Sequence, residues 1–171
     1  MNPRSKRILG VDPGLTFSGF GIVDLCGNKI SYVESGSIGP ADRSHKIPDR
    51  IKFKFEKIGE IIDRAKPDEL ACESIFYARN VKMAIELAHI RGALILSAKL
   101  KNIPVYEYSP LEIKQAVVGY GNATKDQVHK MVKIILRQPE LKDSHASDAL
   151  AAAICHSNTG TLSSRIRDLM T

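Results

Sequence analysis

The sequence predicts an α/β protein with a five-stranded mixed sheet flanked by helices. The first forty residues contain three strand-like segments joined by short turns, and the remainder alternates strand-like with helical patterns, which is typical of that class. A length of 171 residues suits a single domain with a sizeable core. The hydrophobic content of 43% and the charged content of 26% are those of an ordinary globular protein.

The first predicted strand, residues 8–11, delivers a carboxylate, Asp12, to a turn formed by Pro13 and Gly14. Proline cannot continue a central strand and glycine tolerates the dihedral angles of a tight turn, so the strand must end here. A carboxylate at the mouth of a buried strand is costly unless a metal, a cation or a hydrogen-bond donor meets it. A turn-capping acid, a phosphate-binding loop and a metal ligand are all open interpretations of Asp12.

The next segments complete the first half of the sheet. Residues 19–25 and 29–38 read as two strands joined by a Gly27-Asn28 hairpin turn, and residues 39–48 as a polar loop. Apolar residues then recur in steps of three and four over residues 51–65, which predicts an amphipathic helix with Lys and Glu on its outer face. Pro67 ends this helix, and a short buried strand over residues 68–73 again finishes on an acid, Glu73.

The longest helical segment, residues 80–101, is apolar nearly all the way round. Such a helix must be covered on more than one side. The sheet can cover one side, and the other can be covered by a second subunit or by other helices of the same chain. Both arrangements are compatible with the sequence.

The second half continues with a fifth strand over residues 103–108 and a helix over residues 111–118 that begins at Ser109-Pro110. Gly119 to Asn122 form a turn or a hinge, and Thr124 caps a helix over residues 125–138. The final helix, residues 144–156, carries His145 and Asp148. We expect one domain over residues 1–158 and a flexible, Ser/Thr-rich tail over residues 159–171.

Acids from separate segments are expected to converge. If the strands that end at Asp12 and Glu73 are parallel neighbours, their ends lie ~5 Å apart at one edge of the sheet. His145 and Asp148 are three residues apart on a helix and share a face, so that helix can complete the group. Three carboxylates and one imidazole suit Mg²⁺ or Mn²⁺. A His that only caps or packs the final helix is the alternative for His145.

Charge and composition narrow the class of protein. No apolar run approaches the ~20 residues of a membrane helix and no signal peptide is evident, so a cytoplasmic protein without a membrane partner is expected. The three cysteines share no metal-ligand spacing, and we expect reduced thiols. The net charge of +6 suits a polyanionic partner, because a basic chain that concentrates carboxylates in a site carries its positive charge elsewhere.

Four motifs, in this order, resemble those of RuvC-type crossover junction endodeoxyribonucleases: residues 11–14 (VDPG), 73–80 (ESIFYARN), 113–128 (IKQAVVGYGNATKDQV) and 145–148 (HASD). The resemblance covers residues 8–156. It implies a ribonuclease H-like fold, a homodimer, and DNA recombination and repair by paired symmetric nicking of four-way (Holliday) junctions. It also implies two Mg²⁺ ions per subunit, for which Mn²⁺ can substitute, and it leaves a branch-migration helicase open as a partner.

The resemblance also implies roles for individual residues. Asp12, Glu73 and Asp148 match the acidic metal ligands, and His145 stands where the fully acidic motif has an Asp, so it is retained as a ligand. The residues matched to DNA binding are the aromatic that stacks on bases at the crossover, a basic residue in the same segment, and two lysines near the scissile phosphate: Phe76, Arg79, Lys114 and Lys125. By the ordinary rules of burial, Phe76 would be a core residue and Lys114 a solvated helix residue.

Three other functions fit parts of the sequence. An actin-like or sugar-kinase-type ATPase shares the fold and an Asp-x-Gly loop, but it would need a second lobe, for which 171 residues leave no room. Another nuclease of the same fold is disfavoured by residues 114–128. A non-catalytic junction-binding module is disfavoured because all four metal positions hold plausible ligands.

Overall fold

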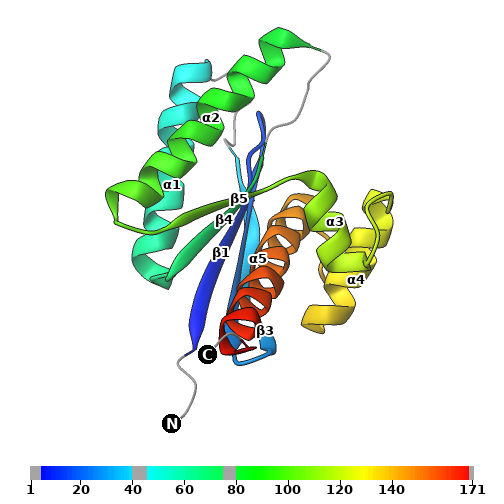
Figure 1. Ribbon diagram of the computed structural model, residues 1–171. Helices are drawn as coiled ribbons and strands as arrows, with labels where there is room; N and C mark the ends of the chain where they lie inside the picture. The colour runs from blue at the N-terminus through cyan, green and yellow to red at the C-terminus, as the bar shows by residue number, and fades with distance from the viewer. Residues whose placement is uncertain (1–4, 40–45, 75–79, 170–171) are drawn as a thin grey trace.

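The computed structural model describes residues 5–39, 46–74 and 80–169 (Figure 1). Phe76 and Arg79 lie outside the described residues. The elements, in chain order, are β1 (Lys6–Asp12), β2 (Ser18–Cys26), β3 (Lys29–Ile38), α1 (Ile47–Ala65), β4 (Glu69–Glu73), α2 (Val81–Leu100), β5 (Val105–Tyr108), α3 (Pro110–Val118), α4 (Lys125–Leu136) and α5 (Ser144–Leu169).

The five strands form one sheet in the order β3-β2-β1-β4-β5, which confirms the predicted mixed sheet. β1 pairs antiparallel with β2, and β2 with β3, whereas β1 pairs parallel with β4, and β4 with β5. Val11 is in register with Cys72, so the next residue of each strand, Asp12 and Glu73, leaves the sheet at the same edge. The expectation that two acid-terminated strands are parallel neighbours is confirmed.

Helices cover both faces of the sheet: α1 and α2 lie on one side, and α5 lies on the other with α3 and α4 outside it (Figure 1). Side chains of β1 alternate between the two layers, as the pleat of a strand requires. Ile8 joins the core beneath α5, whereas Leu9 and Val11 join the core beneath α1 and α2. A sheet buried on both faces explains why residues 8–11 read as a continuous apolar run.

α5 lies unusually close to the sheet because two strand residues beneath it have no side chain. A Cβ at Gly10 would lie 2.0 Å from the carbonyl oxygen of Ala149, and a Cβ at Gly19 would lie 1.9 Å from that of His145. Any larger residue at either position would displace the helix. These two glycines therefore set how near the first turns of α5 come to Asp12.

Two helix boundaries differ from those the sequence predicts by more than two residues. The start of the first helix was predicted wrongly, since α1 begins at Ile47 and holds Pro48 in its first turn, where a missing N–H costs no helical hydrogen bond. The end of the last helix was also predicted wrongly, because α5 continues past His156 to Leu169. Residues 144–169 contain no proline, and polar composition alone does not end a helix.

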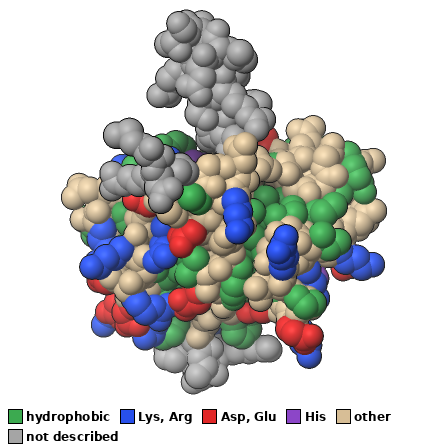
Figure 2. Space-filling model, turned by 90° about the horizontal axis from the view of Figure 1, so that it is seen from below, with side chains coloured by type: hydrophobic (Ala, Val, Ile, Leu, Met, Phe, Trp, Pro, Cys, Tyr) green, Lys and Arg blue, Asp and Glu red, His purple; other side chains and the backbone are tan. Residues whose placement is uncertain are grey.

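Charge is not segregated over the surface that Figure 2 shows, where acidic and basic side chains are interspersed. Within the described part of the chain, no helix has both the length and the apolar composition that crossing a membrane requires.

Candidate active site

The candidate site lies at the edge of the sheet where β1 and β4 end. Asp12 is the last residue of β1 and Glu73 the last of β4, and both side chains are partly buried. Asp148 comes from the second turn of α5, which crosses beneath the same edge. The side chains of Asp12 and Asp148 are 17% and 22% exposed, so neither carboxylate is freely solvated.

The first turn of α5 is fixed by a residue that the sequence analysis did not single out. The Asp143 carboxylate accepts hydrogen bonds from the backbone N–H groups of His145 (2.9 Å) and Ala146 (3.2 Å), and it also accepts one from the Ser37 hydroxyl. Asp143 therefore caps the helix and ties it to β3. An Asp directly before the helical segment was the available signal.

His145 does not cap the helix; its ring faces Asp12. The Nδ1 atom of His145 lies 3.3 Å from Oδ2 of Asp12, and the side chain is partly exposed. The expectation that one face of the final helix approaches the strand-end acids is met by this contact and by the charge of Asp148 next to Asp12.

The acids are partly buried and repel one another electrostatically, which raises the pKa of two of them. Burial, followed by the negative charge of Asp148, raises the pKa of Asp12 to about 6, although the hydrogen bond with His145 and the charge of Lys125 act in the opposite direction. Burial, followed by the charges of Asp12 and Asp148, raises the pKa of Glu73 to about 7 against the influence of Lys125 and Lys114. The three carboxylates therefore form one electrostatically coupled cluster.

Lys125 is the counter-ion of this cluster. It is the first residue of α4, behind a capping box formed by Thr124 and Gln127, and its Nζ lies 2.5 Å from Oδ2 of Asp148. Partial burial opposes the charged form, but the hydrogen bond to Asp148 and the charges of all three acids outweigh it and raise the pKa of Lys125. An ammonium at a helix N-terminus is unfavourable to the helix dipole, so the acids are what hold it there.

A cavity of about 280 Å³ opens beside the cluster. Two of the carboxylates and both lysines matched to DNA binding are among the residues that line it: Glu73, Pro110, Ile113, Lys114, Lys125, Val128, Asp148 and Ala151. Lys114 is partly buried on α3 and faces this cavity, so it is not simply a solvated helix residue.

The donor chemistry of the cluster suits a divalent cation, because buried carboxylates with raised pKa values are relieved by a bound positive charge. Among the residues that the structure describes, no three His, Cys, Asp or Glu side chains form a group that could hold a metal ion in their present conformations. The ion pair with Lys125 engages one oxygen of Asp148, Oδ2, so a metal held by that oxygen would have to displace the ammonium.

Lys54 is a buried cation near this edge, on a helix for which only an outer face of Lys and Glu residues was expected. Its side chain is 0% exposed, and burial, with the nearby charge of Arg50, lowers the pKa of Lys54 to about 8 while the charge of Asp12 opposes the shift. The available signal was its spacing, since Lys54 falls on the apolar stripe, three residues after Ile51 and four before Ile58.

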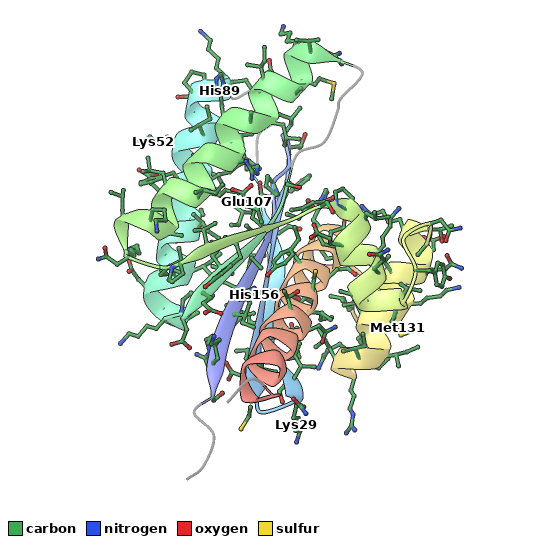
Figure 3. All side chains as sticks on the ribbon, viewed as in Figure 1. Lys29, Lys52, His89, Glu107, Met131 and His156 are labelled. Carbon is green, nitrogen blue, oxygen red and sulfur yellow. The ribbon has the colours of Figure 1, made fainter. Side chains whose placement is uncertain are left out.

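A second histidine of α5 lies far along the helix from the site. His156 is buried between the sheet and α5 (Figure 3), where Nδ1 lies 2.6 Å from the Tyr108 hydroxyl and Nε2 lies 2.6 Å from Oε2 of Glu69. It is a core histidine, and it lies apart from the acid cluster.

The fold and the site together define a ribonuclease H-like nuclease. The sheet is mixed and five-stranded, two neighbouring parallel strands end in acids, and the helix that crosses them carries a further acid. The family model described as crossover junction endodeoxyribonuclease RuvC matches residues 8–156. The chain belongs to this family and is an endodeoxyribonuclease of that class.

Individual relatives support the same family assignment. The RuvC crossover junction endodeoxyribonuclease of Geotalea uraniireducens is 41% identical over 161 residues, which cover 94% of each chain. That of Finegoldia magna is 46% identical over 151 residues, covering 88% of this chain and 92% of the relative. The structure of T. thermophilus RuvC in complex with a Holliday junction substrate superposes with a TM-score of 0.86 at 30% identity, covering 92% of this chain and 96% of that one. The predicted fold and family are confirmed.

Proposed function

We propose that this chain resolves four-way DNA junctions in recombination and repair by paired symmetric nicks, through metal-dependent hydrolysis of phosphodiester bonds. The observation that carries the proposal is the coupled cluster of Asp12, Glu73 and Asp148 beside a cavity that also presents two lysines. Membership of the RuvC family and the similarity to a RuvC bound to a Holliday junction support the choice of substrate.

Four side chains would hold the metal: Asp12, Glu73, His145 and Asp148. Bound divalent ions would supply a water deprotonated near neutral pH and stabilise the leaving oxygen of an in-line displacement. We propose two Mg²⁺ ions per subunit, with Mn²⁺ as a substitute. The carboxylates at the strand ends are rigidly placed, and Asp148 becomes available as its ion pair with Lys125 opens.

The lysines would bind the scissile phosphate. Lys114 and Lys125 line the same cavity as Glu73 and Asp148, so a phosphodiester in it meets ammonium groups on one side and acids on the other. Lys125, once released from Asp148, keeps its charge for the phosphate.

Two further residues are proposed to bind DNA. Phe76 would stack on a base at the crossover, and Arg79 would bind the DNA backbone. We expect Phe76→Ala to reduce cleavage more than junction affinity, as measured on a folded variant.

A homodimer would place two such sites on one junction. Five large apolar residues of α2 remain exposed in the single chain: Val81, Met83, Ile85, Leu96 and Leu100. Four of them, Val81, Ile85, Leu96 and Leu100, share one side of α2 that no other described helix covers, while α1 packs against the opposite side. We propose that this side of α2 forms the two-fold interface of the homodimer.

Three further proposals concern the whole chain. We propose a single domain over residues 1–158, with the rest of α5 as an extension of it. We also propose that the protein is cytoplasmic and that a branch-migration helicase complex is a further partner.

The test is a cleavage assay on a mobile four-way junction with Mg²⁺, with a linear duplex of the same sequence and an RNA–DNA hybrid as controls. We expect symmetric nicks in the junction alone and none with chelator. Cleavage of the hybrid in preference to the junction would assign a different ribonuclease H-like activity, and tight junction binding without cleavage in Mg²⁺ or Mn²⁺ would leave only a binding module.

A further inference from the structure

We infer that Lys54 is a positioning residue for the active site, which fixes the loop between β1 and β2 so that Phe17 is held against His145. The inference rests on the proposed function in one respect, the role of His145 as a ligand. Lys54 itself touches neither the acids nor the cavity.

Lys54 enters the core from α1 and donates to the loop that follows Asp12. Its Nζ lies 2.9 Å from the carbonyl oxygen of Gly14, 3.3 Å from that of Thr16 and 2.9 Å from the hydroxyl of Ser18. A fourth acceptor, the carbonyl oxygen of Ile38, lies 3.4 Å away at the end of β3. An ammonium carries three N–H donors and no acceptor, so a set made of oxygens is the environment in which a buried lysine is satisfied.

The loop depends on this ammonium for its hydrogen bonds. The Ser18 hydroxyl, itself 0% exposed, bonds to the N–H and the carbonyl of Gly14 at 3.2 and 3.3 Å, which closes the loop on itself. The loop is tight, since a Cβ at Gly14 would lie 1.9 Å from the carbonyl oxygen of Phe17. Removing the ammonium takes a donor from the partly buried carbonyl groups of Gly14 and Thr16 and from the buried one of Ile38, and we expect the loop to move so that water can replace it.

Phe17 is the residue through which this loop reaches the site. Its ring centroid lies 6.0 Å from that of His145, with 32° between the ring planes. On another side the ring lies over Gly39, where a Cβ would come within 2.2 Å of it. Lys54 binds the carbonyl of Ile38, directly before Gly39, as well as the loop that carries Phe17. One ammonium thus bonds to the loop that carries Phe17 and to the segment that the ring lies over, while the rest of the ring is exposed to solvent.

The consequence is a constraint on the imidazole. The backbone of His145 is set by the Asp143 cap and by its contact with Gly19, but its ring orientation is not. With Phe17 fixed beside it, the ring keeps Nδ1 towards Asp12. Lys54 therefore acts on the reaction through Phe17 and not by touching the substrate.

The first test needs no activity. In metal-free protein, an NMR cross-relaxation signal between the ring protons of Phe17 and His145 is compared in the parent, in Lys54→Met and in Lys57→Met. Lys57 lies one turn further along α1 and pairs with Glu60 on the surface, so it is the matched control. We expect the signal to be lost in Lys54→Met alone, with core methyl signals unchanged. An undiminished signal in Lys54→Met overturns the inference.

The second test is a double-mutant cycle on junction cleavage. Lys54→Met should lower kcat about ten- to hundredfold with unchanged junction affinity, because displacing a site component by ~1 Å can cost that much. Phe17→Leu should lower kcat too, and the double variant should be no slower than Lys54→Met, since both changes break one chain of contacts. Additive losses overturn the inference.

Two further outcomes are separable. A parent protein that cuts no junction refutes the proposed function, while the NMR comparison still decides whether Lys54 positions Phe17. If Lys54→Met fails to fold, Lys54→Gln carries the same test, because it removes the ammonium and leaves the bonds between the Ser18 hydroxyl and Gly14 in place. In that variant the Phe17–His145 signal should weaken, and a signal equal to that of the parent overturns the inference.

Discussion

Replacing Asp12 by Asn should stabilise the metal-free protein while it abolishes cleavage. The carboxylate is 17% exposed and lies beside the charge of Asp148, so its ionised form is disfavoured in the folded state. Asparagine keeps the shape and removes the charge. Junction affinity should largely survive, since it comes mostly from phosphate contacts.

The magnitude follows from the pKa of Asp12, which burial raises from 3.8 to about 6. A shift of about two units corresponds to roughly 3 kcal/mol of unfavourable free energy above pH 6. Asn gives up part of the interaction with His145, so we expect a net stabilisation of about 1–2 kcal/mol, or roughly 3–6 °C in Tm for a chain of this size. Because the folded-state pKa is the higher one, the cost is absent below about pH 4, grows as pH rises, and is complete above about pH 6.

The assay is thermal unfolding by circular dichroism with EDTA, at about pH 4 and about pH 7.5, the two sides of the titration. Asp126→Asn is the control, because it removes the same charge from an exposed position on α4. We expect Asp12→Asn to exceed the parent at the higher pH and to match it at the lower one, whereas the control should show no such difference.

Two results would refute the reasoning. If Asp12→Asn is no more stable than the parent at the higher pH, the carboxylate carries no electrostatic cost and the cluster is not coupled as described. If Asp12→Asn nicks junctions in Mg²⁺ at a rate comparable to the parent, Asp12 holds no metal.

Three further predictions concern the surroundings of this acid. Lys125→Met should bind Mn²⁺ about fivefold more tightly by calorimetry, because a cation at a largely exposed position opposes metal binding by about 1 kcal/mol. The same variant should cleave junctions more slowly, and an unchanged metal affinity would contradict the counter-ion role of Lys125. His145→Ala should lose most cleavage and His145→Asp should keep it; His145→Ala cutting at the parent rate in low Mg²⁺ would restrict the site to three carboxylates. Ile85→Glu should sediment as a monomer at micromolar concentration, and a persistent dimer would move the interface away from α2.

The parts of the structure that the sequence could predict are those fixed by local patterns. Residues 8–11 had to form a strand that ends at Asp12, because an apolar run meets Pro13 and Gly14. The spacing of His145 and Asp148 placed both on one helical face. Parallel pairing of the two acid-terminated strands was the condition on which their convergence depended, and the register shows that pairing.

The parts that could not be predicted depend on contacts between distant segments. The burial of Lys54 could not be predicted, although its spacing belongs to the apolar stripe, because its four acceptors come from segments up to 40 residues away. Asp143 caps α5 and reaches Ser37 of β3, a contact that no local pattern reveals. The close approach of α5 to the sheet at Gly10 and Gly19 is likewise a tertiary feature, and the presence of glycines in a strand does not predict it.

The electrostatic cost of the acid cluster also predicts how a bound metal should change the difference in stability between the parent and Asp12→Asn. The parent concentrates three carboxylates at one edge, and Lys125 offsets only part of their repulsion. A ligand that binds the native state alone stabilises it by about 2.7 kcal/mol at a hundred times its Kd, which exceeds the 1–2 kcal/mol expected for Asp12→Asn. With saturating Mg²⁺ the parent should therefore become the more stable protein, reversing the order seen with EDTA. If Asp12→Asn remains more stable than the parent by the same amount in Mg²⁺, metal binding does not offset the electrostatic cost of the Asp12 charge. Another arrangement of ligands must then hold the ion.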